Sequence, residues 1–215
     1  MDKKIPKTTP KLKIEFDEFQ KEVVKDFYNY DINLVLGRQG TGKTLLATGL
    51  ALTSLRKKEF KNIVITRPIV KNDLGFLPGD IDSKMEPWVY PLIHNFNICQ
   101  DKDVTEKMLK EGTIEILPLT FFKGCTFTDS VVIVDEIQDT DLETLKIIIS
   151  RLGVNSKMIL CGSKEQVDKS MTKTSCIKDL EKLISFEEKI IGYNTLTVNH
   201  RNPIVFKILD ILDTK

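Results

Sequence analysis

The chain has 215 residues, which is the size of one compact domain. Its 32 lysines and arginines against 31 aspartates and glutamates give a formal charge of +1, and this balance excludes a nucleic-acid binder whose whole surface is basic. With 41% hydrophobic and 29% charged residues, the composition is that of a globular protein rather than a disordered chain.

Three absences narrow the class of protein. No run of about 18 apolar residues is present, and the lysine-rich amino terminus has no apolar core, so we expect no membrane span, no secretory signal and a cytoplasmic location. The four cysteines lie far apart, which favours reduced thiols over a metal knuckle or a disulfide scaffold. Because there are only two histidines, a bound metal is expected to have oxygen ligands.

Residues 1–12, with their lysines and prolines, predict a flexible leader, followed by a single domain over 13–215. Aromatic and valine residues at helical spacing predict a helix from about Phe16 to Phe27, which ends before a turn at 29–31. Short β-branched runs predict buried strands at Ile32–Leu36, Asn62–Thr66, Ile114–Leu117, Val131–Val134 and Met158–Cys161.

Helical patterns lie between these strands, at Lys43–Lys58, Met85–Phe96 and Leu142–Arg151, the last preceded by Thr140 and Asp141 as candidate caps. This alternation predicts an α/β fold with a mostly parallel sheet and helices on both faces. Prolines and glycines in residues 67–82 predict a long loop or insertion there.

Residues 37–44, Gly-Arg-Gln-Gly-Thr-Gly-Lys-Thr, match the pattern Gly-x4-Gly-Lys-Ser/Thr between a predicted strand and a predicted helix. Glycines let the backbone amides and the helix terminus face a phosphate group, and Lys43 adds a positive charge near the β- and γ-phosphates. The hydroxyl of Thr44 is expected to bind Mg²⁺.

A second motif completes this constellation. The apolar run 131–134 ends in Asp135 and Glu136, and parallel sheets bind ligands at the carboxyl edge of their strands. We expect Asp135 to hold the Mg²⁺ ion and Glu136 to polarise the attacking water, an arrangement that suits hydrolysis.

With both motifs present, the chain after residue 12 resembles the PhoH family, a group of RecA-like P-loop ATPases related to the first domain of superfamily-one helicases. The most specific stretches are Thr66–Val70 and Leu74–Asp80, which are similar to the family's Thr-Arg-Pro and Leu-Gly-Phe-Leu-Pro-Gly-Asp signatures. Residues 135–139 and 150–157 match further family motifs, and Arg201–Val205 is similar to Arg-His-Pro-Leu-Val.

The resemblance implies roles for individual residues. It implies that Arg201 contacts phosphate, in its own chain or in a neighbouring subunit, and that Gln20 reads adenine. Gln138 and Gln166 are expected to sense or orient the γ-phosphate and the water, and Arg67 to contact phosphate or nucleic acid. The residues expected to act in catalysis are Lys43, Glu136, Gln138, Gln166 and Arg201. The expected nucleotide-binding residues are Gln20, Gly37, Arg38, Gln39, Gly40, Thr41, Gly42, Lys43, Thr44 and Arg67, with Thr44 and Asp135 on the metal.

The sequence departs from the family at three places. Arg38 and Gln39 lie in the phosphate loop, where small or apolar residues are usual. Ser163 stands where an aspartate is usual, so that carboxylate is missing or is supplied by Glu165 or Asp168. Cys125 replaces a basic residue, which leaves Lys123 as the charge at that position.

These features predict an enzyme that hydrolyses ATP with Mg²⁺, coupled to RNA or another single-stranded nucleic acid. One RecA-like domain is too little for two-domain unwinding, so we expect a homo-oligomer, such as a ring in which Arg201 acts across the interface. Two alternatives are a nucleotide-responsive interaction module with weak hydrolysis and a small-molecule kinase, although the arginine-rich lid of such a kinase is absent.

Overall fold

The computed structural model describes residues 16–68, 81–167, 171–172, 174–186 and 189–213. In this part of the chain the helices are α1 Glu18–Asn29, α2 Lys43–Arg56, α3 Ile81–Cys99, α4 Lys102–Lys110, α5 Leu142–Ile149, α6 Ile177–Ile184 and α7 Pro203–Asp213. The strands are β1 Ile32–Gly37, β2 Asn62–Thr66, β3 Ile114–Ile116, β4 Ser130–Val134, β5 Lys157–Gly162 and β6 Gly192–Leu196, and two 3-10 turns are η1 Leu119–Phe122 and η2 Ile137–Asp139.

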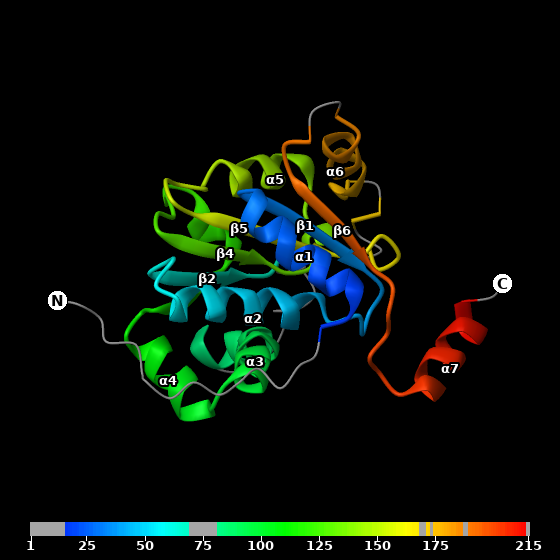
Figure 1. The fold of residues 1–215 in the computed structure, drawn as a ribbon, viewed down its shortest axis with the longest axis horizontal. Helices are drawn as coiled ribbons and strands as arrows, with labels where there is room; N and C mark the ends of the chain where they lie inside the picture. Colours follow the sequence, from blue (N-terminus) through cyan, green and yellow to red (C-terminus); the bar gives the residue numbers. More distant parts are fainter. Residues whose placement is uncertain (1–15, 69–80, 168–170, 173, 187–188, 214–215) are drawn as a thin grey trace.

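The strands form one parallel sheet in the order β3-β2-β4-β5-β1-β6 (Figure 1). Because side chains alternate along a strand, each strand contributes to two cores. Val35 and Ile133 pack with α1 to α4 on one face, whereas Leu34 and Val132 pack with α5 and α6 on the other. The expected parallel sheet with helices on both faces is confirmed.

The five predicted strands are all present, with ends that differ by one residue at most. The predicted helices are present too, and Asp141 caps α5 by accepting a hydrogen bond from the Thr144 amide at 2.8 Å. Thr140 is not the cap, because its hydroxyl donates to the Ile137 carbonyl.

The prediction of a loop over 67–82 is wrong at its end, because α3 already begins at Ile81. Residues 69–80 and the expected leader 1–12 lie outside the described residues. No prediction covered α4, α6, β6 or α7.

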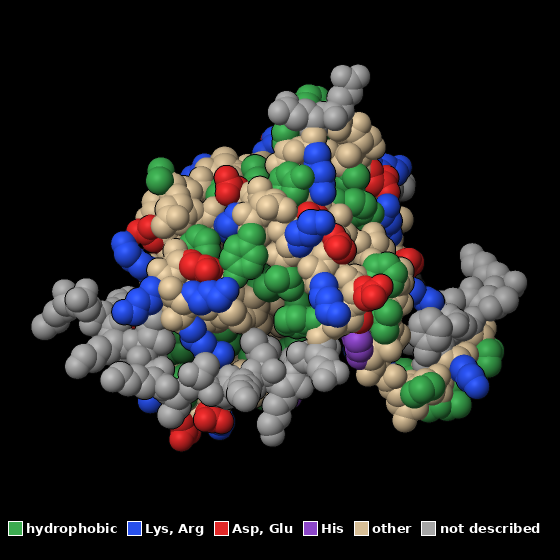
Figure 2. Space-filling model, viewed as in Figure 1, with side chains coloured by type: hydrophobic (Ala, Val, Ile, Leu, Met, Phe, Trp, Pro, Cys, Tyr) green, Lys and Arg blue, Asp and Glu red, His purple; other side chains and the backbone are tan. Residues whose placement is uncertain are grey.

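The carboxyl-terminal helix α7 stands away from the sheet (Figure 1). Its side chains Ile204, Val205, Ile208 and Ile211 are 37–72% exposed, and Figure 2 shows hydrophobic side chains on this helix. An isolated helix of this length is marginal in water unless it buries an apolar face. None of the helices within the described ranges is long and apolar enough to cross a membrane.

Candidate active site

The loop between β1 and α2 turns at two glycines. Gly40 has a φ of +85° and Gly42 a φ of +79°, a left-handed conformation that glycine adopts without steric cost. Gly42 is the N-cap of α2, and no side chain caps this helix. The first amides of α2 therefore point out of the helix, where its dipole favours an anion.

Lys43 is held inside this loop. Its Nζ donates hydrogen bonds to the carbonyl oxygens of Gly37 at 2.7 Å and Arg38 at 3.1 Å, and the side chain is buried. The Thr41 hydroxyl donates to the same Arg38 carbonyl at 2.9 Å. The loop therefore surrounds the Lys43 ammonium group, which lies next to the backbone amides at the start of α2.

Thr44 and Asp135 join the two motifs. The Thr44 hydroxyl donates to Asp135 Oδ1 at 2.7 Å, although β5 lies between β1 and β4 in the sheet. Burial, and then the charge of Glu136, raises the pKa of Asp135 to about 6, while Thr44, Arg67 and Lys43 act in the opposite direction. The nearby cations therefore do not fully offset the burial of the Asp135 charge. Hydroxyl and carboxylate oxygens are the ligands that Mg²⁺ prefers. Thr44 and Asp135 therefore fit a Mg²⁺ ion.

Glu136 is held by the amide of Gln138. Glu136 has φ +51° and ψ +43°, a left-handed conformation that is uncommon for a residue with a side chain. Gln138, which is 1% exposed, donates to Glu136 Oε2 at 2.7 Å and to the Gln166 carbonyl at 3.3 Å. Its Oε1 accepts from the Ser163 amide at 3.0 Å. Since both ends of the amide are engaged, Gln138 is placed to orient Glu136 rather than to face a phosphate.

Ser163, at the position where an aspartate was expected, has a carboxylate beside it. The Ser163 hydroxyl donates to Glu165 Oε2 at 3.1 Å. Of the two acids considered as substitutes, Glu165 is therefore adjacent, while Asp168 lies outside the described residues. The side chain of Gln166 is exposed, and its contact with the site is through its carbonyl.

The segment after β6 is tied to the phosphate loop. The His200 amide donates to the Gly40 carbonyl at 3.0 Å, and Asn199 Nδ2 donates to the Gln39 carbonyl at 3.0 Å. A Cβ placed on Gly40 would lie 2.9 Å from Cγ and Cδ of Arg201. Arg201 therefore lies against the phosphate loop of its own chain.

Gln20 is also at this loop, and it is buried rather than solvated, with 4% exposure. Asp17 and Gln20 form a capping box at the start of α1, and Gln20 Nε2 lies 3.3 Å from Nε2 of His200. The same His200 nitrogen is 3.3 Å from Asp17 Oδ2. Because a Cβ on Gly42 would be 3.4 Å from Gln20 Nε2, the amide lies beside the amino end of α2.

The structure thus brings one group of the expected residues together around Asp135 and a second group around the rim of the loop. The first group is Lys43, Thr44, Asp135, Glu136 and Gln138, with Arg67 half-buried close to Asp135. Gln20 and Arg201 form the second group, with Arg38 half-buried and Gln39 exposed. Asn199 and His200 were missed, although they directly precede the arginine that the resemblance singled out.

A cavity of about 200 Å³ opens beside the phosphate loop. It is walled by the loop, by the segment after β5 and by the segment after β6, and its lining residues are Leu36, Gly37, Arg38, Thr41, Lys164, Glu165, Thr195, Leu196, Thr197 and Asn199. The loop is therefore accessible from the β6 side of the sheet.

The free energy of unfolding of a Gly40→Ala variant is expected to be about 1–3 kcal/mol lower than that of the wild type. The alanine would have a left-handed backbone conformation and its Cβ would clash with Arg201. The variant is also expected to bind nucleotide more weakly. Gly112→Ala is the matched control, since Gly112 has a φ of +64° and open space around its Cβ. Denaturant unfolding measures the stability of both variants. Equal losses of stability in Gly40→Ala and Gly112→Ala would show that the Arg201 contact contributes nothing.

Comparison with known proteins gives a consistent family. The family described as PhoH-like protein matches residues 15–213. A PhoH-like protein of Bacillus subtilis (strain 168) is 34% identical over 200 residues, which cover 90% of this chain and 62% of that protein. A PhoH-like protein of Synechocystis sp. is 33% identical over 194 residues, covering 89% and 59%. The chain therefore spans less than two thirds of the length of either relative.

Among solved structures, the large terminase from a thermophilic bacteriophage has a TM-score of 0.59 and 11% sequence identity, and the match covers 94% of this chain and 51% of that one. At this identity the likeness is one of fold. It assigns the sheet and its helices to the RecA-like P-loop architecture.

Proposed function

Because the chain belongs to the PhoH-like protein family, we propose that it binds ATP with Mg²⁺ and hydrolyses it to ADP and phosphate. The observation that carries this proposal is the 2.7 Å hydrogen bond between Thr44 and Asp135. It places the phosphate loop, a carboxylate suited to a metal ion and the adjacent Glu136 in one site.

Each of these residues has a role in the proposed reaction. The loop amides and Lys43 hold the phosphates, and Thr44 and Asp135 hold the Mg²⁺ ion, which would offset the negative charge of the phosphate oxygens. Glu136 accepts a proton from water as the water oxygen bonds to the γ-phosphorus, and the bond from that phosphorus to the bridging oxygen breaks to release ADP.

Four further residues support this chemistry. Gln138 orients Glu136. Gln166 senses the γ-phosphate through the loop after β5, which also contains Ser163. Gln20 reads the adenine base with the second lone pair of its Oε1 and the second hydrogen of its Nε2, because the Asp17 amide and His200 engage one of each. Arg201, with its stem against Gly40, is placed to bind phosphate in its own chain, and action across a subunit interface would require it to leave that glycine.

The proposal includes coupling to RNA or another single-stranded nucleic acid, which is supported by family and fold likeness. It also includes a cytoplasmic location, which agrees with four free cysteines. Steady-state ATP hydrolysis by the purified chain, with and without single-stranded RNA at one stated low salt concentration, tests it. We expect phosphate release that needs Mg²⁺ and rises with RNA, and release equal to that of a Glu136→Gln variant would overturn the proposal.

A homo-oligomer is part of the proposal because α7 has exposed apolar side chains and stands away from the sheet. An Ile208→Glu variant, which places a charge at a 49% exposed position on α7, is expected to reduce the assembly to one chain of 24.6 kDa. Light scattering measures the mass, and Lys207→Glu on the same helix is the control. A single-chain mass for the wild type would refute the assembly.

One observation favours a second candidate, a nucleotide-responsive interaction module with weak hydrolysis. Gln138 holds Glu136 Oε2 at 2.7 Å, which leaves Oε1 as the oxygen that can accept a proton from water. If ATP binds but wild type and Glu136→Gln release phosphate equally slowly, this second function is the correct one.

A further inference from the structure

The turn η1, directly after β3, presents an aromatic ring to solvent at the carboxyl edge of the sheet. Phe121 is 63% exposed, whereas Phe122 beside it is fully buried. The Phe122 ring packs edge-on against Phe127 with a centroid distance of 4.9 Å. The turn therefore fixes the Phe122 ring in the core and directs the Phe121 ring outward.

The backbone around Phe121 is held on both sides. Its amide donates to the Pro118 carbonyl at 3.0 Å, and its carbonyl accepts from the Cys125 thiol at 3.1 Å. The Cys125 amide donates to the Phe122 carbonyl at 3.1 Å. An exposed ring on a rigid turn binds a flat ligand at little entropic cost.

The segment that carries this ring has a positive charge and no negative one. Residues 116–128 contain no aspartate or glutamate and one lysine, Lys123, which is exposed. Arg151 reaches this segment by donating to the Cys125 carbonyl at 3.3 Å. On α5, which packs against η1, Glu143 forms an ion pair with Lys146 at 2.7 Å.

The neighbouring strand adds Arg67. Ile116 pairs with Ile65 in the sheet, and the Leu117 amide donates to the Ile65 carbonyl at 3.0 Å. If this register continued for two more residues, Pro118, which precedes η1, would face Arg67, which follows β2. Aromatic rings flanked by cations are how proteins bind single-stranded nucleic acid without reading its sequence.

We propose that Phe121, Lys123 and Arg67 form a platform that binds single-stranded nucleic acid, with a base stacked on the Phe121 ring and phosphates on the two cations. This inference rests on the proposed function, which it deepens by naming the surface of contact.

The platform adjoins the nucleotide site. The Asp135 amide donates to the Thr66 carbonyl at 2.9 Å. Arg67 therefore directly follows a residue whose backbone is hydrogen-bonded to Asp135. A strand bound at Arg67 would therefore act next to the backbone hydrogen bond between Thr66 and Asp135, and this contact is a physical route from nucleic acid to the nucleotide site.

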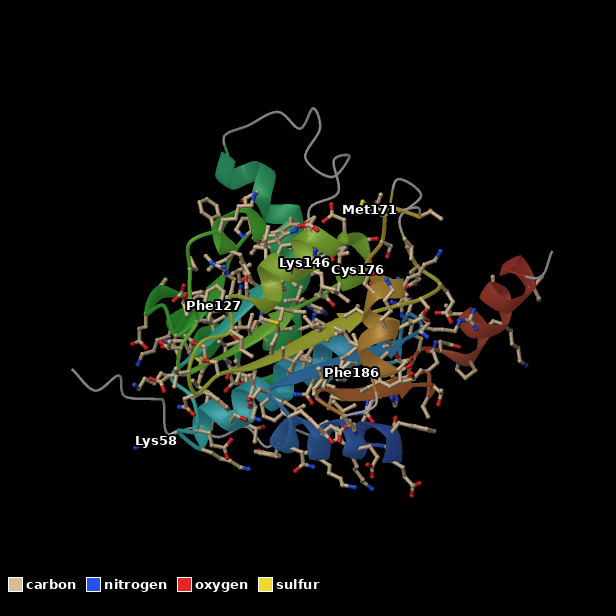
Figure 3. The ribbon with its side chains drawn as sticks, turned by 90° about the horizontal axis from the view of Figure 1, so that it is seen from above. Lys58, Phe127, Lys146, Met171, Cys176 and Phe186 are labelled. Carbon is tan, nitrogen blue, oxygen red and sulfur yellow. The ribbon has the colours of Figure 1, made fainter. Side chains whose placement is uncertain are left out.

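A Phe121→Ala variant tests the platform. Binding of a fluorescent uridine oligonucleotide, measured by anisotropy at fixed salt, is expected to weaken about tenfold, because stacking on one aromatic ring is lost, while basal hydrolysis is unchanged. Phe121→Tyr is expected to retain binding. Phe186→Ala is the matched control, since Phe186 is 61% exposed but lies at the end of α6, apart from Phe127 in Figure 3.

A Lys123→Ala variant supplies an independent measurement. It is expected to reduce the slope of log affinity against log salt by about 1, because one phosphate contact is removed. Equal affinity of Phe121→Ala and wild type, or absence of binding by wild type, would overturn the platform. If no variant hydrolyses ATP, the proposed function fails, and the affinities still decide the platform.

Discussion

A Glu136→Gln variant is expected to bind ATP about as tightly as the wild-type chain and to hydrolyse it about 10²- to 10⁴-fold more slowly. Glutamine keeps the size of the side chain, and its amide oxygen can still accept the hydrogen bond that Gln138 donates at 2.7 Å. What is lost is the carboxylate that, in the proposed reaction, takes a proton from the attacking water. The effect is therefore expected in kcat and not in ATP affinity.

Single-turnover phosphate release and a nucleotide-binding titration separate these two quantities. Glu143→Gln is the matched control, because Glu143 is an exposed carboxylate in an ion pair with Lys146 on α5 and lies outside the site. A Glu136→Gln variant with wild-type turnover would contradict the assignment of the base. Loss of ATP affinity in this variant would instead show that Glu136 holds the nucleotide complex together.

The central strands were predictable because their residues are buried on both faces. Val131–Val134 and Met158–Cys161 are unbroken apolar runs, and burial from two sides selects that pattern. β6 was not predicted, because an edge strand needs fewer apolar residues. Its Tyr193, Asn194 and Thr195 are partly exposed or exposed, and Asn194 donates to Asp26 on α1 at 3.0 Å.

The contact between Thr44 and Asp135 follows from motif and topology, since both lie at the carboxyl edge of one parallel sheet. The pairing of Gln138 with Glu136 does not follow from sequence, because it depends on the left-handed backbone at Glu136. The contact between His200 and Gln20 joins positions 180 residues apart. Such long-range side-chain contacts leave no periodic trace in a single sequence.

The raised pKa of Asp135 has a consequence for stability. Its carboxyl titrates at about 6 in the folded chain against 3.8 for the ordinary group, so the folded state holds this proton to higher pH than the unfolded state does. Stability therefore falls as pH rises from about 4 to about 6 and stays lower above that range. At neutral pH the ionised Asp135 carboxylate lowers the stability of the folded chain, and bound Mg²⁺ would remove this destabilisation.

An Asp135→Asn variant is accordingly expected to be more stable than the wild type by about 3 kcal/mol at pH 7.5 without Mg²⁺, and about equally stable near pH 4. It is expected to lose about 10²-fold or more in ATP turnover, because the metal loses its charged ligand. Urea unfolding at the two pH values, with and without Mg²⁺, measures the first effect, and phosphate release measures the second.

Asp129→Asn is the control, because the opposite change in stability is expected for it. Hydrogen bonds from Asn155 and Lys61 hold the pKa of Asp129 below its ordinary value, so this carboxylate favours the folded state and its removal is expected to lower stability slightly. If Asp135→Asn destabilised the chain at pH 7.5 as well, the charge of Asp135 would be compensated by Lys43 and Arg67 without a metal. Stabilisation coupled to loss of turnover would instead show that this buried charge is kept for catalysis at the expense of stability.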